Sequence, residues 1–216
     1  MVKNNEKKLA IILLGAPGSG KGTQGEILEK NTGFRRYVMS DFIKKELKPG
    51  SNLYNKVFKN GELLGDVDIF NIFGKYFKSE NQVIIDGIPR TLNQAYWLYG
   101  FLMNYYYNIE LVFFDVDEKK LLKRIISRRY CPKCHRLYNE NTNKPKRKGF
   151  CDFDGEKLVQ REDDKKDIFS DRLKIFDAVK KVILNVYKGN LIEVNANGTI
   201  EEVSQRMIKK IILNDK

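Results

Sequence analysis

Residues 9–24 constrain the fold more than any other part of the chain, and they read LAIILLGAPGSGKGTQ. The first six are apolar, which is typical of a strand buried on both faces of a parallel sheet. The glycines that follow let the backbone curl so that successive N–H groups point into one concavity. The N-terminus of a helix predicted to begin at Lys21 faces the same concavity. The segment therefore predicts an anion-binding loop between a buried strand and a helix.

The loop carries the pattern G-x-x-x-x-G-K, from Gly15 to Lys21, which is typical of P-loops. Gly22 stands where a Ser or Thr usually follows the lysine, and the hydroxyl comes one place later, at Thr23. A glycine-rich turn without a ligand would not require the lysine, whereas its charge suits phosphate oxygens. We therefore expect the loop to bind the phosphates of a nucleotide.

Apolar runs alternate with helix-like segments along the rest of the chain, which predicts an α/β fold with a parallel sheet covered by helices on both faces. A short extended piece is expected at residues 37–40, and further buried strands at residues 82–86, 110–116 and 190–195. Helices are expected at residues 21–31, 41–47, 51–60, 66–78, from 91 onward, 117–129, from 163 or 164 to 188, and 199–213.

The composition limits the class of protein. A length of 216 residues suits one substantial core with small inserted units. No apolar run approaches the length of a membrane span, and the first eight residues are polar, without the layout of a signal peptide. Three clustered cysteines do not suggest a secreted disulfide framework, so we expect a reducing, cytoplasmic location. The aromatic residues 96–107 are expected to pack in the core rather than to stack on nucleic-acid bases.

The three cysteines lie in a polar stretch that interrupts the alternation of strands and helices. Cys131 and Cys134 form one pair, Cys151 and Asp154 form a second, and the spacing between the pairs is typical of a zinc ribbon with a carboxylate as fourth ligand. A segment of about thirty residues buries too little core to fold alone, so a metal would supply the missing folding free energy. We therefore expect these four residues to hold a structural Zn²⁺.

Four stretches together resemble the motifs of the adenylate kinases: GAPGSGKGTQ, DGIPRTLNQA, RIISRR and a later RxDD followed by Arg172. Their order and spacing match along nearly the whole chain, which is similar to the members of this nucleoside monophosphate kinase family that have a zinc-containing lid. The resemblance implies reversible phosphoryl transfer from MgATP to AMP, giving two ADP, in adenine nucleotide homeostasis. It also implies a P-loop core at residues 1–36, 66–129 and 161–216, an inserted helical flap that binds the monophosphate at 37–65, and a zinc lid at 130–160.

The resemblance also implies roles for charged residues. Phosphoryl transfer between two phosphates needs alignment and charge compensation, and an acceptor phosphate that is mostly a dianion needs no general base. Arginine suits this task because a guanidinium stays charged and binds phosphate bidentately. Arg124 and Arg128 are expected on one helix face, and Arg161 and Arg172 would share a face if their helix reaches back that far. The residues expected to be catalytic are Lys21, Arg90, Arg128, Arg161, Arg172 and Asp86, the last orienting Mg²⁺ through waters.

The binding residues follow from the same resemblance. For ATP they are Gly18, Ser19, Gly20, Lys21, Gly22, Thr23, Arg124, Arg128, Leu137, Tyr138 and Ile200. For AMP they are Met39, Lys44, Glu62, Leu63, Leu64, Gly87, Ile88, Pro89, Arg90, Gln94, Arg161 and Arg172. Gln94 resembles the glutamine that hydrogen-bonds the acceptor adenine, which favours AMP over UMP or CMP. Asp163 and Asp164 are expected either to pair with lid arginines or to cap a helix.

Two departures from the family pattern concern the acceptor. The sequence Met39-Ser40-Asp41 stands in place of Thr-Gly-Asp, and Lys44 stands where an arginine is expected. Lysine keeps the charge but loses the bidentate fork of a guanidinium. A related kinase with GTP as donor or another acceptor is therefore the nearest alternative.

The net charge of +12 raises an alternative of another class, a zinc-ribbon, P-loop protein that binds nucleic acid. That alternative leaves the phosphate-facing arginines without a role. We therefore expect ATP, AMP and ADP as partners of a monomeric enzyme, with no nucleic acid and no membrane.

Overall fold

The computed structural model describes residues 8–214, so predictions that concern residues 1–7 and 215–216 lie outside the described part. Within it, a five-stranded parallel sheet has the order β2-β3-β1-β4-β7. This confirms the expected α/β class with a parallel sheet. The strands of the sheet are β1 (Lys8–Gly15), β2 (Arg35–Val38), β3 (Gln82–Asp86), β4 (Tyr107–Asp115) and β7 (Leu191–Asn195).

β1 is the central strand, and its apolar run explains that place. It pairs with β3 on one side, with Leu9 opposite Gln82, and with β4 on the other, with Ile12 opposite Leu111. Alternate side chains of a strand point to opposite faces of the sheet, and here both sets are buried. Ile12 belongs to one apolar cluster and Ile11 to the other. The strand therefore fixes both halves of the core.

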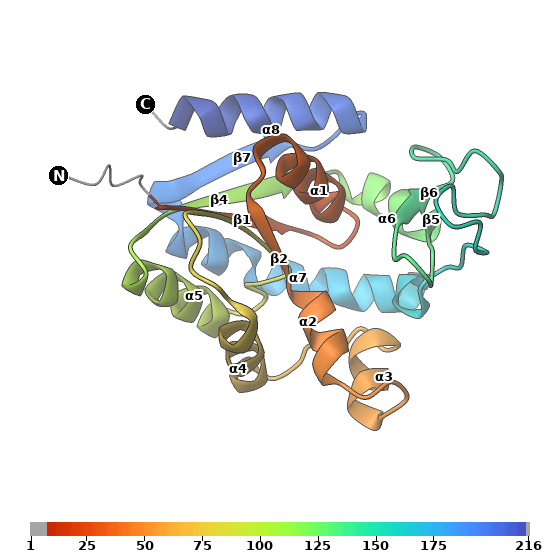
Figure 1. The fold of residues 1–216 in the computed structure, drawn as a ribbon, viewed down its shortest axis with the longest axis horizontal. Helices are drawn as coiled ribbons and strands as arrows, with labels where there is room; N and C mark the ends of the chain where they lie inside the picture. Colours follow the sequence, from red (N-terminus) through yellow and green to blue (C-terminus); the bar gives the residue numbers. More distant parts are fainter. Residues whose placement is uncertain (1–7, 215–216) are drawn as a thin grey trace.

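Helices cover both faces of the sheet, as Figure 1 shows. Leu28 of α1 and Met207 of α8 pack against one face, together with Ile11 of β1. Phe73 of α4, Leu98 of α5 and Ile183 of α7 belong to the cluster on the other face. The helices of these two layers are α1 (Lys21–Thr32) and α8 (Ile200–Asn214), and α4 (Asp66–Tyr76), α5 (Leu92–Asn104) and α7 (Lys166–Val186).

The aromatic stretch packs as predicted. Phe101 of α5 lies edge-to-face against Phe73 of α4, with ring centroids 5.6 Å apart, and Trp97 stacks on Phe70 at 4.4 Å. Tyr106, at the end of the stretch, is 88% exposed. These rings bury apolar surface between α4 and α5, so the stretch serves the core.

Two segments extend from the sheet at its carboxyl edge. Residues 37–65 contain α2 (Met39–Glu46) and α3 (Asn52–Phe58), so residues 39 and 40 are helical rather than extended as predicted. Residues 130–160 pack as a small unit around β6 (Leu137–Asn139), which pairs antiparallel with β5 (Arg128–Tyr130). Figure 1 shows the first at the lower right and the second at the far right.

Two helix predictions at this edge are wrong. α6 (Glu118–Ile126) ends before Arg128, because Arg128 pairs with Asn139 in the antiparallel sheet, so Arg124 and Arg128 do not share a helix face. α7 begins at Lys166, and a short 3₁₀ turn, Glu162–Asp164, precedes it, so Arg161 is not on the helix of Arg172.

The buried hydroxyl of Tyr187 yields a stability prediction. Tyr187 is fully buried just after α7, and its hydroxyl donates to the carbonyl oxygen of Ala95 at 3.0 Å. Replacing Tyr187 by Phe removes this bond, so the free energy of unfolding should fall by about 1–2 kcal/mol. The measurement is urea denaturation, with Tyr106→Phe as the exposed control, which should change stability by less than about 0.5 kcal/mol. Equal stability of the two variants would contradict the prediction.

Candidate active site and metal centre

The predicted phosphate-binding loop connects β1 to α1 at the carboxyl end of the sheet, where ligands of open α/β sheets bind. Gly18 and Gly20 have φ angles of +83° and +96°, which glycine adopts without steric cost. A Cβ atom at Gly18 would lie 2.9 Å from the Ile125 side chain, so a larger residue would also clash with α6. No side chain caps the first turn of α1, which leaves its N–H groups to an anion.

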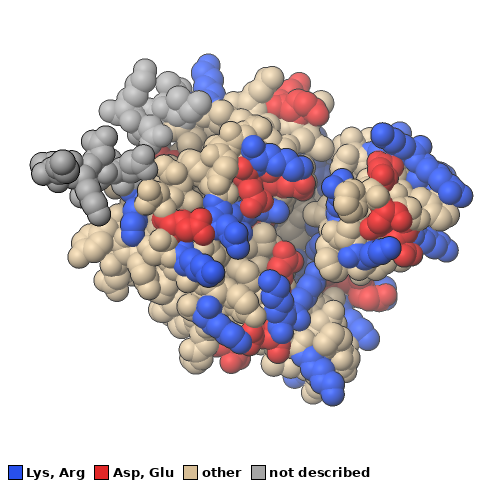
Figure 2. All heavy atoms as spheres, in the orientation of Figure 1, with Lys and Arg blue, Asp and Glu red and all other residues tan. Residues whose placement is uncertain are grey.

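A cleft of about 340 Å³ opens over this loop, between the sheet and residues 130–160. Figure 2 shows it as a hollow with Lys and Arg along its margin. Its lining combines the loop, the end of β3, α6, α7 and residues 130–160, which lie far apart in sequence. The cleft brings together all the residues expected to be catalytic: Lys21, Asp86, Arg90, Arg128, Arg161 and Arg172.

Lys21 lies at the floor of the cleft among other cations. Its Nζ donates to the carbonyl oxygens of Gly15 and, at 3.0 Å, Ala16. Burial lowers the pKa of Lys21 to about 7; Asp86 opposes this shift, and nearby arginines, led by Arg90, add to it. The ammonium is therefore only partly charged at neutral pH, and a phosphate would restore its charge.

Asp86 ends β3 and lines the cleft, where its charge acts on Lys21 and Arg90. Burial raises the pKa of Asp86, and the charges of Lys21 and Arg36 oppose the rise. Arg36 of β2 was not predicted. Its guanidinium lies 3.6 Å from the Asp86 carboxylate and also donates to the Gly22 carbonyl at 3.1 Å, so it ties β2 to the start of α1. Only the fold brings these positions together, so no local pattern indicated Arg36.

Two ion pairs hold arginines of the cleft. Arg128 binds the fully buried Asp164 through two nitrogens, with Nε 2.7 Å from the carboxylate. Arg172 binds the Asp163 carboxylate at 2.7 Å. Neither of these pairs involves an arginine of residues 130–160, which was the prediction for the two aspartates: Arg128 lies just before that segment, and Arg172 is on α7. Neither aspartate caps α7, because its N-cap is Lys165.

The predicted ATP-binding residues also border the cleft. Arg124, Leu137 and Ile200 line it together with the glycine-rich loop. Arg124 donates to the Ala196 carbonyl at 2.9 Å, which places its guanidinium near the start of α8. Tyr138 lines the cleft too, but its hydroxyl points into residues 130–160 and lies 3.4 Å from Cys151 Sγ.

The predicted AMP-binding residues are distributed differently. Lys44 lines the main cleft, and burial, with Arg161 nearby, lowers its pKa. A smaller cavity of about 90 Å³ adjoins the cleft. Met39 and Gln94 are 1% and 2% exposed, so the structure places both in the core. Leu64 is also buried, and Glu62 is exposed. The predicted residues that line the smaller cavity are Leu63, Gly87, Ile88, Pro89, Arg90 and Arg172.

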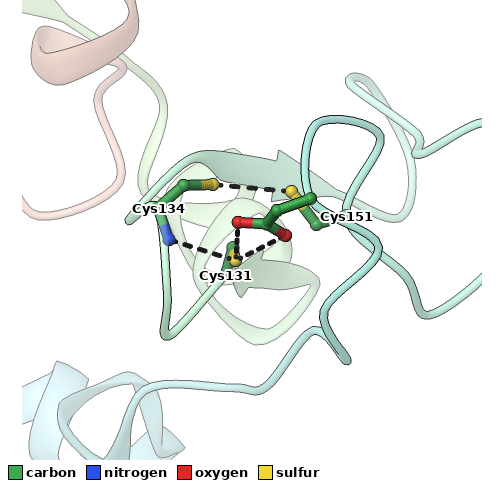
Figure 3. Close-up of side chains that lie close together, drawn as sticks. Cys131, Cys134 and Cys151 are labelled. Carbon is green, nitrogen blue, oxygen red and sulfur yellow. Dashed lines mark hydrogen bonds between the residues drawn. The ribbon is translucent and has the colours of Figure 1, made fainter.

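The predicted metal ligands form one cluster. One ligand atom from each of Cys131, Cys134, Cys151 and Asp154 lies within 4.8 Å of all the others. Figure 3 shows the three cysteine side chains converging, with Cys134 Sγ 3.5 Å from Cys151 Sγ. The Asp154 carboxylate lies 3.3 Å from Cys131 Sγ. Three sulfurs and one carboxylate suit a tetrahedral metal site.

The hydrogen bonds around the cluster favour the thiolate form of the cysteines, which is the form that binds a metal. The backbone N–H of Cys134 donates to Cys131 Sγ, and that of Phe153 to Cys151 Sγ, each at 3.4 Å. The Tyr138 hydroxyl accepts the N–H of Asp152 at 2.9 Å and lies 3.4 Å from Cys151 Sγ, to which it donates when that sulfur is a thiolate. Donors of this kind orient and stabilise a thiolate ligand. The residues therefore fit a structural metal.

Comparisons with known proteins agree with the geometry. The family model described as adenylate kinase matches residues 13–192. An adenylate kinase of Ureaplasma parvum is 36% identical over 207 residues, covering 90% of this chain and 94% of the relative. One of Mesoplasma florum is 39% identical over 203 residues, covering 89% and 95%. One of Onion yellows phytoplasma is 33% identical over 218 residues, covering 96% and 100%. In the described part of the chain, no helix combines the length and apolarity that crossing a membrane requires.

The low pKa of Lys21 predicts proton uptake on ATP binding. At pH 8 a group with a pKa of about 7 is mostly neutral, whereas phosphate groups, with a second pKa of about 6, are already ionised. Bound phosphate raises the pKa of Lys21, so ATP binding should take up close to one proton. Calorimetry in buffers of different ionisation enthalpy measures this number, and Lys21→Arg, which stays charged, should abolish it. The same uptake in both proteins would refute the assignment to Lys21.

Proposed function

The chain belongs to the adenylate kinase family, and from this premise we propose how its residues divide the work of an ATP:AMP phosphotransferase. The reaction moves a phosphoryl group between adenine nucleotides. The observation that carries the assignment of roles is the convergence of Lys21 and four arginines on one cleft from separate parts of the chain. No single stretch of sequence contains this site.

The donor phosphates lie over the glycine-rich loop in this proposal. The N–H groups of residues 18–23 and the ammonium of Lys21 bind the phosphates, and Arg128 contacts the γ-phosphate. Arg124 stacks on the donor base beside Leu137 and Ile200, and Tyr138 contributes backbone and ring surface. Mg²⁺, when bound with ATP, neutralises phosphate charge, and Asp86 orients its water shell.

The acceptor monophosphate lies on the other side of the transferring group. Its phosphate and the phosphoryl group that is being transferred are bound by Arg90, Arg161 and Arg172. Lys44 adds a point charge where the family has an arginine, and Gln94 reads the base. Residues 62–64 and 87–89 enclose the nucleoside. The Met39 side chain is buried, so Met39 acts by packing against the residues that enclose the nucleoside.

The ion pairs give the arginines defined resting places. Asp163 binds Arg172, and Asp164 binds Arg128. The buried Asp164 and the partly buried Asp163 also keep the two guanidinium groups in the cleft instead of letting them extend into solvent. When phosphates enter, each guanidinium shares its donors between carboxylate and phosphate, since it has five N–H groups.

Residues 37–65 act as the acceptor flap and residues 130–160 as the lid in this proposal, with the remaining residues as the core. Adenylate kinase is itself a known example of lid closure, which excludes water from the reacting phosphates. The lid carries the cluster of Cys131, Cys134, Cys151 and Asp154, and we assign Zn²⁺ to it because three sulfurs disfavour Mg²⁺ or Ca²⁺. We further propose a cytoplasmic monomer, in which free thiolates are retained for the metal.

A GTP-dependent kinase or one with another acceptor is the second candidate, and Lys44 is the observation that favours it. A matrix of AMP, GMP, CMP and UMP against ATP and GTP separates the two, with the fastest turnover expected for ATP and AMP.

Arg172 provides the sharpest test of the cationic site. Replacing Arg172 by Met should lower kcat by about a hundredfold or more, because it removes a donor that compensates charge in the transition state. Lys174→Met is the matched control: its side chain lies two positions away on α7 and is 79% exposed. It should leave kcat within about twofold. Steady-state kinetics measures both, and similar losses in the two variants would contradict the proposed role.

The lid metal is tested separately from catalysis. Cys134→Ser should lower the zinc content and the melting temperature, while turnover well below the melting temperature changes less, because the metal stabilises the lid and does not touch the phosphates. Elemental analysis, thermal unfolding and a kinase assay on one sample measure the three quantities. Lys133→Ser, an exposed neighbour, is the control. Equal zinc content in Cys134→Ser and wild type would refute the ligand assignment.

A further inference from the structure

Asp66 holds the side chain of Gln94 at the point where residues 37–65 rejoin the core. Asp66 is the first residue of α4, and its Oδ1 accepts from Gln94 Nε2 and from Thr91 Oγ1, each at 2.9 Å. At its other atom, Gln94 Oε1 accepts the backbone N–H of Arg90 at 2.8 Å. The carboxamide is thus bound at both ends, and Gln94 as a whole is 2% exposed.

These two contacts fix which way round the carboxamide lies. A carboxylate only accepts hydrogen bonds, so Nε2 must face Asp66, and a backbone N–H only donates, so Oε1 must face Arg90. Rotating the amide by 180° would break both bonds. It would place the NH₂ group against the Arg90 N–H and the carbonyl oxygen against the Asp66 carboxylate. Thr91, which donates to the same Asp66 oxygen, keeps the carboxylate in position.

The locked amide has one N–H and one oxygen lone pair left for a ligand. Adenine presents a 6-amino donor beside the N1 acceptor, which one orientation of the amide can pair with. Hypoxanthine presents a 6-oxo acceptor beside an N1–H donor, which requires the opposite orientation. We propose that Asp66 is a positioning residue that locks the Gln94 carboxamide and so selects 6-amino over 6-oxo purine monophosphates. This rests on the proposed role of Gln94 as the reader of the acceptor base.

The surroundings agree with this role. Gly87, Pro89 and Arg90, which lead to Gln94, line the smaller cavity beside the cleft. Because Gln94 is almost fully buried, a base reaches it only after neighbouring side chains move. A free amide would be able to turn during that movement, whereas the contacts to Asp66 and Arg90 keep it in one orientation.

The experiment compares AMP with IMP, which differ at the 6-position and the N1 proton. Asp66→Ala should lower the ratio of kcat/KM for AMP over IMP by roughly three- to tenfold, which corresponds to the net contribution of about one ordinary hydrogen bond. The change should appear in KM and in calorimetric Kd rather than in kcat, since the base is remote from the reacting phosphorus. Asp66→Asn keeps an oxygen acceptor at the same place and should restore the ratio to within about twofold.

The controls separate this proposal from the role of Gln94. Asp68→Ala removes an exposed acid from the same first turn of α4 and should leave the ratio unchanged. Should Asp66→Ala fail to fold, Asp66→Ser, which cannot reach the amide, replaces it. Equal losses of kcat/KM for AMP and IMP in the Asp66→Ala variant would show that Asp66 has only a structural role, and would overturn the proposal. An unchanged ratio in Gln94→Leu would instead refute base reading by Gln94.

Discussion

Repulsion between cations at the carboxyl end of the sheet is the interaction on which the site depends. Lys21, Arg90 and Arg161 each have a pKa lowered by burial, and neighbouring arginines lower it further. Gathering like charges in a partly desolvated cleft costs free energy, which the packing of the apolar core offsets. A chain of phosphates relieves the repulsion, and the charge that develops during phosphoryl transfer meets donors that are already in place.

In the proposed division into core and lid, the cations of the site are distributed over both parts. β1 is buried on both faces and fixes the glycine-rich loop at its end, while Arg36 ties β2 to Asp86 and to the first turn of α1. Arg128 and Arg161 flank residues 130–160, and Arg128 belongs to the small antiparallel sheet. Movement of that segment would therefore carry two of the cations, while Lys21 stays with the core.

The sequence predicts those features that depend on neighbours along the chain. The buried run at residues 9–14, the glycine-rich loop and the paired spacing of Cys131 to Asp154 each follow local rules, and the structure shows them as expected. Arg128 was misplaced because its strand forms only through pairing with Asn139. Arg36 and Asp66 were missed for the same kind of reason: their partners lie many residues away, and only the assembled fold brings them together.

A crystal structure with a bisubstrate analogue, two adenosines joined by a chain of five phosphates, tests the central claim most directly. Our account predicts that the phosphate chain spans the cleft, with one end on the N–H groups of residues 18–23 and Lys21, and the middle and far end within hydrogen-bond distance of the four arginines. A chain bound elsewhere, or bound in the cleft with the arginines still turned only to their aspartates, would contradict it.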